Sequence, residues 1–171
     1  MPTRSLYALT FSKLPAERTG IDIPEPLTMR EVDAGDRDRL ARLLLDSYAG
    51  TIDDENGTME EAGVEIDNFL KGEYGEPLLD ASVVAADAGG VPRSGVLITR
   101  WGRQGYPLVA FVMTEPAFQG KGIARALLSE SLRRMKENGE EEARAAITVG
   151  NTASEKLFER VGFLRIETFE S

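Results

Sequence analysis

The segment from Leu108 to Asn138 constrains the fold more than any other part of the chain. An apolar run ends at Thr114, a turn containing Pro116 follows, and Gly120 and Gly122 precede a long amphipathic stretch. In that stretch the apolar residues recur at helical spacing: Ile123, Ala124, Leu127, Leu128, Leu132 and Met135. The pattern predicts a strand, a glycine-rich loop and a helix in succession, which is typical of a layered α/β structure.

Ten elements are predicted from Leu27 onward, in the order β-α-α-β-β-β-α-β-α-β. The predicted strands are Leu27–Val32, Leu78–Ala86, Val91–Trp101, Tyr106–Thr114, Ala143–Val149 and Phe163–Phe169. Four helices are predicted. The first is capped by Asp36, the second is opened by the capping box Thr58-x-x-Glu61, the third spans Gln119–Glu137, and the fourth is opened by a second capping box, Thr152-x-x-Glu155. Hairpins come first and a βαβ unit follows, so we expect a mixed, mostly antiparallel α/β sheet with helices on both faces.

The first 26 residues differ from the rest of the chain in their proline content. Pro2, Pro15, Pro24 and Pro26 predict an extended leader, so the chain is divided into residues 1–26 and a domain over residues 27–171. Within the leader, Leu6–Phe11 has the character of a strand that lies on the main domain or on a partner.

Composition excludes several kinds of chemistry. The chain of 171 residues has no cysteine and no histidine, which rules out disulfides, thiolate metal sites, cysteine nucleophiles and Ser-His-Asp triads. We expect no metal, and any proton transfer must use a carboxylate, a tyrosine, a lysine, a terminal amine or water. The net charge of −9 disfavours nucleic acid as a partner. With no apolar run of membrane-spanning length and no signal sequence, we expect a cytoplasmic protein without membrane contact.

The glycine-rich loop has two interpretations. Helix N-termini present unpaired amides that suit a pyrophosphate, and Gly120 and Gly122 would let phosphate oxygens approach them, with Lys121 or Arg125 as a countercharge. The glycines could equally serve only to turn the chain into the helix. Neither the P-loop pattern nor the dinucleotide fingerprint fits this segment.

Two separate motifs favour the first interpretation. Gln119, Gly122 and Ala124 match the acetyl-CoA signature Q/R-x-x-G-x-G/A. The run from Asn151 to Phe163 matches a second pattern, N-x-x-A/S-x-x-L-Y/F-x-x-x-G-F. In both motifs, in their separation and in the order of elements from about Leu27, the chain resembles the GNAT superfamily of N-acetyltransferases.

The resemblance implies an acetyl-CoA site with defined roles. The backbone of Val112, Met113 and Thr114 would pair with the pantetheine arm, and an amide there would polarise the thioester carbonyl. Amides of the loop would hold the pyrophosphate, and Asn151 would reach the pantetheine or the sulfur, although a plain helix cap is its alternative role. The implied cofactor-binding residues are Val112, Met113, Thr114, Gln119, Gly120, Lys121, Gly122, Ile123, Ala124, Arg125, Asn151 and Phe158.

The chain departs from its relatives where acid–base groups are expected. Phe158 stands where many relatives have a tyrosine, and Ala146 stands where some have a glutamate. No catalytic residue is therefore assigned, and each candidate for the proton transfer could also be an ordinary surface residue: Asp53, Asp54, Glu55, Asp80, Glu115 and Tyr106. Tyr48 and Trp101 either line an acceptor pocket or pack in the core.

The resemblance implies direct transfer of an acetyl group from acetyl-CoA to an amine of a small molecule or a peptide. Homodimers are frequent in the superfamily, so a homodimer is a further expectation. Two other functions stay open: a non-catalytic acyl-CoA-binding sensor or regulatory module, and an interaction protein whose loop binds nothing.

Overall fold

A seven-stranded sheet with the strand order β2-β3-β4-β5-β6-β1-β7 forms the centre of the protein. The structure is a computed structural model that describes residues 2–14 and 22–170. The strands are β1 Thr3–Thr10, β2 Thr28–Glu31, β3 Val83–Ala86, β4 Pro92–Trp101, β5 Tyr106–Thr114, β6 Glu142–Thr148 and β7 Leu164–Glu170. The helices are α1 Arg37–Tyr48, α2 Met59–Lys71, α3 Ile123–Glu137 and α4 Thr152–Val161. From β2 onward, the predicted order of elements and the mixed α/β class are confirmed.

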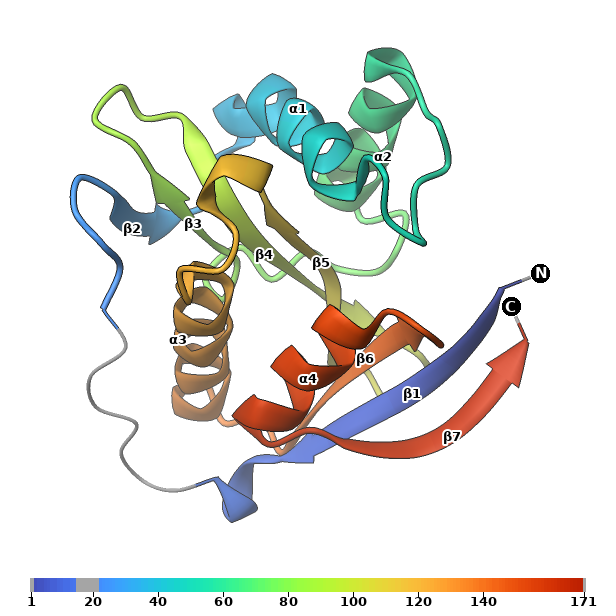
Figure 1. Ribbon diagram of the computed structural model, residues 1–171. Coiled ribbons are helices and arrows are strands. Elements are labelled where there is room, and N and C mark those ends of the chain that lie inside the picture. The colour runs from blue at the N-terminus through green and yellow to red at the C-terminus, as the bar shows by residue number, and fades with distance from the viewer. Residues whose placement is uncertain (1, 15–21, 171) are drawn as a thin grey trace.

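Helices cover both faces of the sheet, as Figure 1 shows. Successive residues of β3 point to opposite sides, so Val83 and Ala85 pack with α3 and α4 while Val84 packs with α1 and α2. All of the strand pairs are antiparallel except β5 with β6. None of the helices in the described part of the chain has the length and apolar character needed to cross a membrane.

The strand β1 lies inside the sheet, between β6 and β7 and antiparallel to both (Figure 1). Tyr7, Leu9 and Phe11 are buried in the same core as α3 and α4. Of the two alternatives for Leu6–Phe11, the strand on the main domain is therefore the observed one. Residues 15–21 of the expected leader lie outside the described residues, and the boundary at residue 26 stays a prediction.

Two predicted boundaries are wrong by several residues. The helix expected from Gln119 begins at Ile123, because Gly120 and Gly122 have φ values of 75° and 77° and cannot continue a right-handed helix. The strand expected from Leu78 begins at Val83, because residues 78–82 form a turn in which the Ala81 amide donates to the Leu78 carbonyl.

The strands β5 and β6 separate soon after they meet, and this separation positions the site. Their parallel pairing covers only Leu108 with Arg144 and Val109 with Ala145. On its other side, β5 has a bulge against β4, where Ile98 pairs with Val109 but Leu97 pairs with Phe111. A bulge bends the strand that carries it. The extra residue is Ala110, where the pairing with β6 ends.

Candidate functional site

A cavity of about 1140 Å³ opens where β5 and β6 diverge. Its walls come from β5, β6 and β1, from the start of α4, and from the α1–α2 loop with the adjoining helix faces. Six acidic residues line it, whereas Arg4 is its one basic residue among those that the structure describes. The volume is close to the upper end of the range for small-molecule sites, which is about 300–1,000 Å³.

On the edge of β5 that faces the gap, Val112 has backbone groups that no described strand pairs with. The Glu115 amide donates to the Arg93 carbonyl on β4, so by alternation the amides of Val112 and Thr114 point away from β4. The Thr114 amide is satisfied by the Ser47 hydroxyl at 3.0 Å, and the Thr114 carbonyl accepts from Gln119 Nε2 at 3.1 Å. Val112, which also lines the cavity, is left as the position on β5 that can pair with a ligand.

The loop after β5 ends at a helix N-terminus without a side-chain cap. No side chain in the described residues caps α3 at Gly122, so the first amides of this helix point into solvent. A Cβ atom at position 120 or 122 would have no neighbour within 4 Å, so the positive φ, and not crowding by the chain, requires glycine here. Open space above unpaired amides fits the pyrophosphate that acetyl-CoA would place there.

Phe118 positions a cation beside this loop. The Lys121 ammonium lies 5.4 Å from the centre of the Phe118 ring, and the Arg93 guanidinium lies 5.8 Å from it. Arg93 is neutralised by ion pairs with Asp87 and Glu115, whereas Lys121 and Arg125 are exposed. Lys121 and Arg125 are therefore the two cations of this segment that can add charge to a phosphate site.

Asn151 joins the start of α4 to the α1–α2 loop. Its Oδ1 accepts from the Ser154 amide at 3.2 Å and its Nδ2 donates to Asp53 Oδ2 at 2.8 Å. The other oxygen of Asp53 accepts from the Thr148 hydroxyl at 2.6 Å. The capping box predicted at Thr152 is wrong, because Asn151 is the N-cap and Thr152 is the first residue of the helix. Of the two roles considered for Asn151 in the sequence, the helix cap is therefore observed, while the contact with the cofactor stays a prediction for a residue that lines the cavity.

Tyr48, at the end of α1, contributes a phenol to the same wall of the cavity. Burial raises the pKa of this phenol well above its ordinary value, the negative charge of Asp53 raises it further, and Arg4 opposes the rise. The phenol is therefore protonated throughout the neutral range and can donate a hydrogen bond into the cavity.

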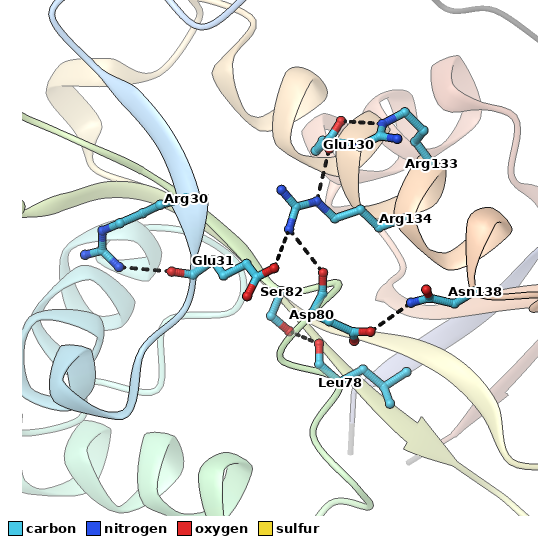
Figure 2. A network of polar contacts seen from close by, with 9 residues as sticks. All are labelled: Arg30, Glu31, Leu78, Asp80, Ser82, Glu130, Arg133, Arg134 and Asn138. Atoms are coloured by element: carbon cyan, nitrogen blue, oxygen red, sulfur yellow. Dashed lines mark hydrogen bonds and ion pairs between the residues drawn. The ribbon is translucent and has the colours of Figure 1, made fainter.

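Three of the six candidate acid–base residues lie away from the cavity. Figure 2 shows Asp80 between β3 and α3, where its carboxylate accepts from Asn138 and its carbonyl from Arg134. Glu115 is paired with Arg93, and the Tyr106 ring lies under the Arg144 guanidinium at 4.8 Å. Asp53, Asp54 and Glu55 do line the cavity. Asp54 accepts from the amides of Gly50 and Asn56, which lowers the pKa of its carboxyl and fixes the shape of the loop.

The expected cofactor residues fall into three groups. Val112, Asn151 and Phe158 line the cavity, and Phe158 also packs edge-on against Phe163 at 5.1 Å. Met113, Thr114 and Ile123 form a second group, whose side chains are buried. The Met113 backbone faces β4, and the Thr114 backbone is bound by Ser47 and Gln119, so within this group only the Ile123 backbone could contact a ligand. The third group lies around the N-terminus of α3, outside the cavity: Gln119, Gly120, Lys121, Gly122, Ala124 and Arg125.

Sequence reasoning missed Arg4, which lines the cavity from β1. The segment around it predicted only a strand, and no local signal brings that strand beside β6. In the described residues, no group of three acidic side chains has a geometry that could hold a metal ion.

The comparison with family models agrees with the geometry of the site. The model of the acetyltransferase (GNAT) family matches residues 43–163. The chain belongs to this family. Among curated proteins, no sequence matches the chain.

Solved structures of GNAT proteins share the fold. A GCN5-related N-acetyltransferase from Sphaerobacter thermophilus has a TM-score of 0.74 at 18% identity, over 98% of this chain and 50% of that protein. This chain therefore spans about half the length of that relative. A GNAT acetyltransferase from Brucella melitensis, solved with acetyl-CoA, has a TM-score of 0.63 at 17% identity, covering 86% and 91% of the two chains. A phosphinothricin acetyltransferase from Sinorhizobium meliloti, also with acetyl-CoA, has a TM-score of 0.63 at 21% identity, covering 81% and 75%.

Proposed function

We propose that this GNAT protein is an acetyl-CoA-dependent N-acetyltransferase that transfers the acetyl group directly to an amine. The observation that carries the proposal is the edge of β5, which is unpaired at Val112 and leads to the uncapped N-terminus of α3. Acetyl-CoA has an extended pantetheine arm, which suits the free strand edge, and a pyrophosphate at one end of that arm, which suits the uncapped helix N-terminus. The acetyl-CoA in the Brucella and Sinorhizobium structures supports the choice of ligand.

In this proposal each part of acetyl-CoA meets a separate element. The first amides of α3 and the ammonium of Lys121 bind the pyrophosphate. The Val112 amide and carbonyl pair with the pantetheine arm, which brings the thioester to the cavity beside Asn151 and Phe158. The Tyr48 phenol stays protonated at neutral pH, so it is suited to donate a hydrogen bond to the leaving sulfur in place of the hydroxyl that Phe158 lacks.

Asp53 is the carboxylate best placed to receive the proton of the amine. Hydrogen bonds from Thr148 and Asn151 fix its orientation, and each of its oxygens keeps a second lone pair directed elsewhere. The amine attacks the carbonyl carbon, so that a C–N bond forms while the C–S bond breaks. The proton leaves the nitrogen for Asp53, directly or through water. CoA leaves as the thiolate, which takes a proton from solvent water.

Acetylation of a panel of amines, measured as released CoA thiol, tests the function. Because the chain has no cysteine, it contributes no background thiol. We expect turnover with at least one amine, a rise in melting temperature with acetyl-CoA alone, and a fall in kcat of about 10²–10⁴-fold in Asp53→Asn, the range of general-base catalysis. Glu55→Gln removes another carboxylate of the cavity and serves as the control.

The sensor alternative gives a different result in the same assays. Stabilisation by acetyl-CoA without release of thiol, for every amine in the panel, would favour a non-catalytic acyl-CoA-binding module. Absence of both effects would refute the proposal altogether.

A further inference from the structure

Arg4 is a cation in the cavity that has no hydrogen-bond or ion-pair partner among the residues that the structure describes. Its Nε atom is buried without a hydrogen bond, and the side chain makes no hydrogen bond or ion pair with any described residue. A buried N–H group without an acceptor is costly, because its lost hydrogen bond to water is not replaced. This is unexpected in a cavity with six acidic residues.

Three carboxylates of the cavity accept hydrogen bonds from residues other than Arg4. Arg4 pairs across strands with Thr148, whose hydroxyl donates to Asp53, and the second oxygen of Asp53 is bound by Asn151. At the α2 side of the cavity, Glu61 accepts from the Thr58 amide and Glu65 accepts from the Tyr74 hydroxyl. Because no carboxylate in the described residues bonds to Arg4, its guanidinium is available to an anion that enters from outside.

We propose that Arg4 binds the carboxylate of the acceptor, so that the substrate is an amine that also carries a carboxylate, as an amino acid does. This inference rests on the proposed N-acetyltransferase function. Arg4 and Asp53 are both neighbours of Thr148. One small molecule can therefore place its carboxylate against Arg4 and its amine against Asp53.

Two other anions fit the cavity less well. A phosphate carries up to two charges and would face one guanidinium among six acidic side chains, whereas a carboxylate carries one charge and matches the planar fork of arginine. In the proposed function, the phosphates of acetyl-CoA bind at the uncapped N-terminus of α3 and not at Arg4, since the residues of that N-terminus do not line the cavity.

Matched pairs of substrates test the inference. Each L-amino acid is compared with its α-carboxamide, which keeps the amine and removes the charge of the carboxylate. For the best amino acid, we expect the wild-type kcat/KM to exceed that of the amide by roughly 10- to 100-fold, as for a hydrogen bond to a charged group. In Arg4→Gln this preference disappears while the rate with the amide and the KM for acetyl-CoA stay within about two-fold. Arg4→Lys restores part of the preference, because it keeps the charge but not the fork.

Arg165→Gln is the control, because it removes a cation from the neighbouring strand β7, outside the cavity, and should leave the preference intact. Equal use of acid and amide by the wild type would overturn the inference while the acetyltransferase function stands. So would an Arg4→Gln variant that loses both activities equally, since that indicates a structural role. If no amine is acetylated at all, calorimetry of the same amino acids with wild-type and Arg4→Gln protein still decides whether Arg4 binds a carboxylate.

Discussion

At the scale of single residues, Asn151 shows how closely stability and the site are coupled. One end of its amide caps α4 and the other end holds Asp53. Both Asn151 and the following Thr152 are good N-cap residues, so the sequence alone could not choose between them. Asn151 has an additional hydrogen bond to Asp53, which lies in a loop almost one hundred residues earlier, and this bond favours Asn151 as the cap.

Substitutions at Asn151 should separate its two roles. A serine can still cap the helix but does not reach Asp53, whereas an alanine does neither. We expect Asn151→Ala to lower the free energy of unfolding by about 1–2 kcal/mol and Asn151→Ser to cost less than half of that. Both variants should lose acetylation activity to a similar extent. An Asn151→Ser enzyme with wild-type activity would show that the bond to Asp53 does not matter for function.

Asp36 makes a pH-dependent contribution to stability. Its carboxylate is buried, which by itself raises its pKa, but two hydrogen bonds from Arg30 at 2.7 and 2.8 Å and one from the Asp33 amide outweigh burial and lower the pKa overall. A lowered pKa means that the stabilisation is complete above the ordinary pKa of an aspartate, about 4, and is lost as the pH falls through the lower folded value.

The variant Asp36→Asn should therefore be less stable than the wild type only at pH values where the Asp36 carboxylate is ionised. Near pH 7 we expect it to be less stable by about 1–3 kcal/mol, because Arg30 loses the carboxylate that it binds in a fork. As the pH falls below the ordinary pKa of an aspartate, about 4, the two melting temperatures should approach each other. A constant difference at all pH values would mean that packing, and not the ion pair, is lost.

At the scale of elements, the loop before α3 defines the phosphate site. Gly122 and Gly139 lie just beyond opposite ends of this helix, have φ values of 77° and 84°, and in both cases a Cβ atom would have no neighbour within 4 Å. Substitution of either glycine by alanine should therefore lower the free energy of unfolding by about 1–2 kcal/mol through backbone strain, without a steric clash.

Only Gly122→Ala should affect the cofactor. Its added methyl group enters the open space above the α3 amides, so we expect the affinity for acetyl-CoA to fall by more than about ten-fold, equivalent to 1.4 kcal/mol. Gly139→Ala should keep the wild-type affinity at a similar loss of stability. Equal affinities in calorimetric titrations of the two variants would remove the loop from the phosphate site.

Local signals in the sequence predicted the elements but not all of their ends. The capping box at Thr58 and Glu61 is present as predicted, since it depends on neighbouring residues alone. The starts of α3 and β3 were placed too early, because apolar residues continue through the loop and the turn that precede them. The glycine loop of the site was predicted from the same local signals, whereas the gap between β5 and β6 depends on a bulge opposite β4 that has no sequence signature of its own.

At the scale of the whole molecule, β1 could not be positioned from the sequence. Its apolar pattern predicts a strand, but its neighbours in the sheet, β6 and β7, come from the other end of the chain. Tyr7 of β1, for example, pairs with Ala145 on one side and with Arg165 on the other. The same long-range pairing brings Arg4 to the cavity, which explains why this residue was missed. Thr3 at the start of β1 pairs with Glu170 at the end of β7, and Figure 1 shows these two strand ends side by side.

This arrangement makes β1 part of the folding unit, which Leu9→Ala can test. Leu9 is buried at 2% exposure in the core shared with α3 and α4, and β1 is the described strand to which β7 is paired. Truncation of a buried leucine typically lowers the free energy of unfolding by about 2–5 kcal/mol. For a protein of this size, each kcal/mol corresponds to a fall in melting temperature of roughly 2–4 °C.

Thr10→Ala, in the same strand but exposed, is the matched control and should change the melting temperature by less than about 2 °C. The loss in Leu9→Ala should appear as a single cooperative transition at a lower temperature, because β7 and the α4 core unfold together with β1. If β1 were a detachable leader, the variant would melt like the wild type. A separate early transition would likewise contradict the view that the sheet, from β2 to β7, is one cooperative unit.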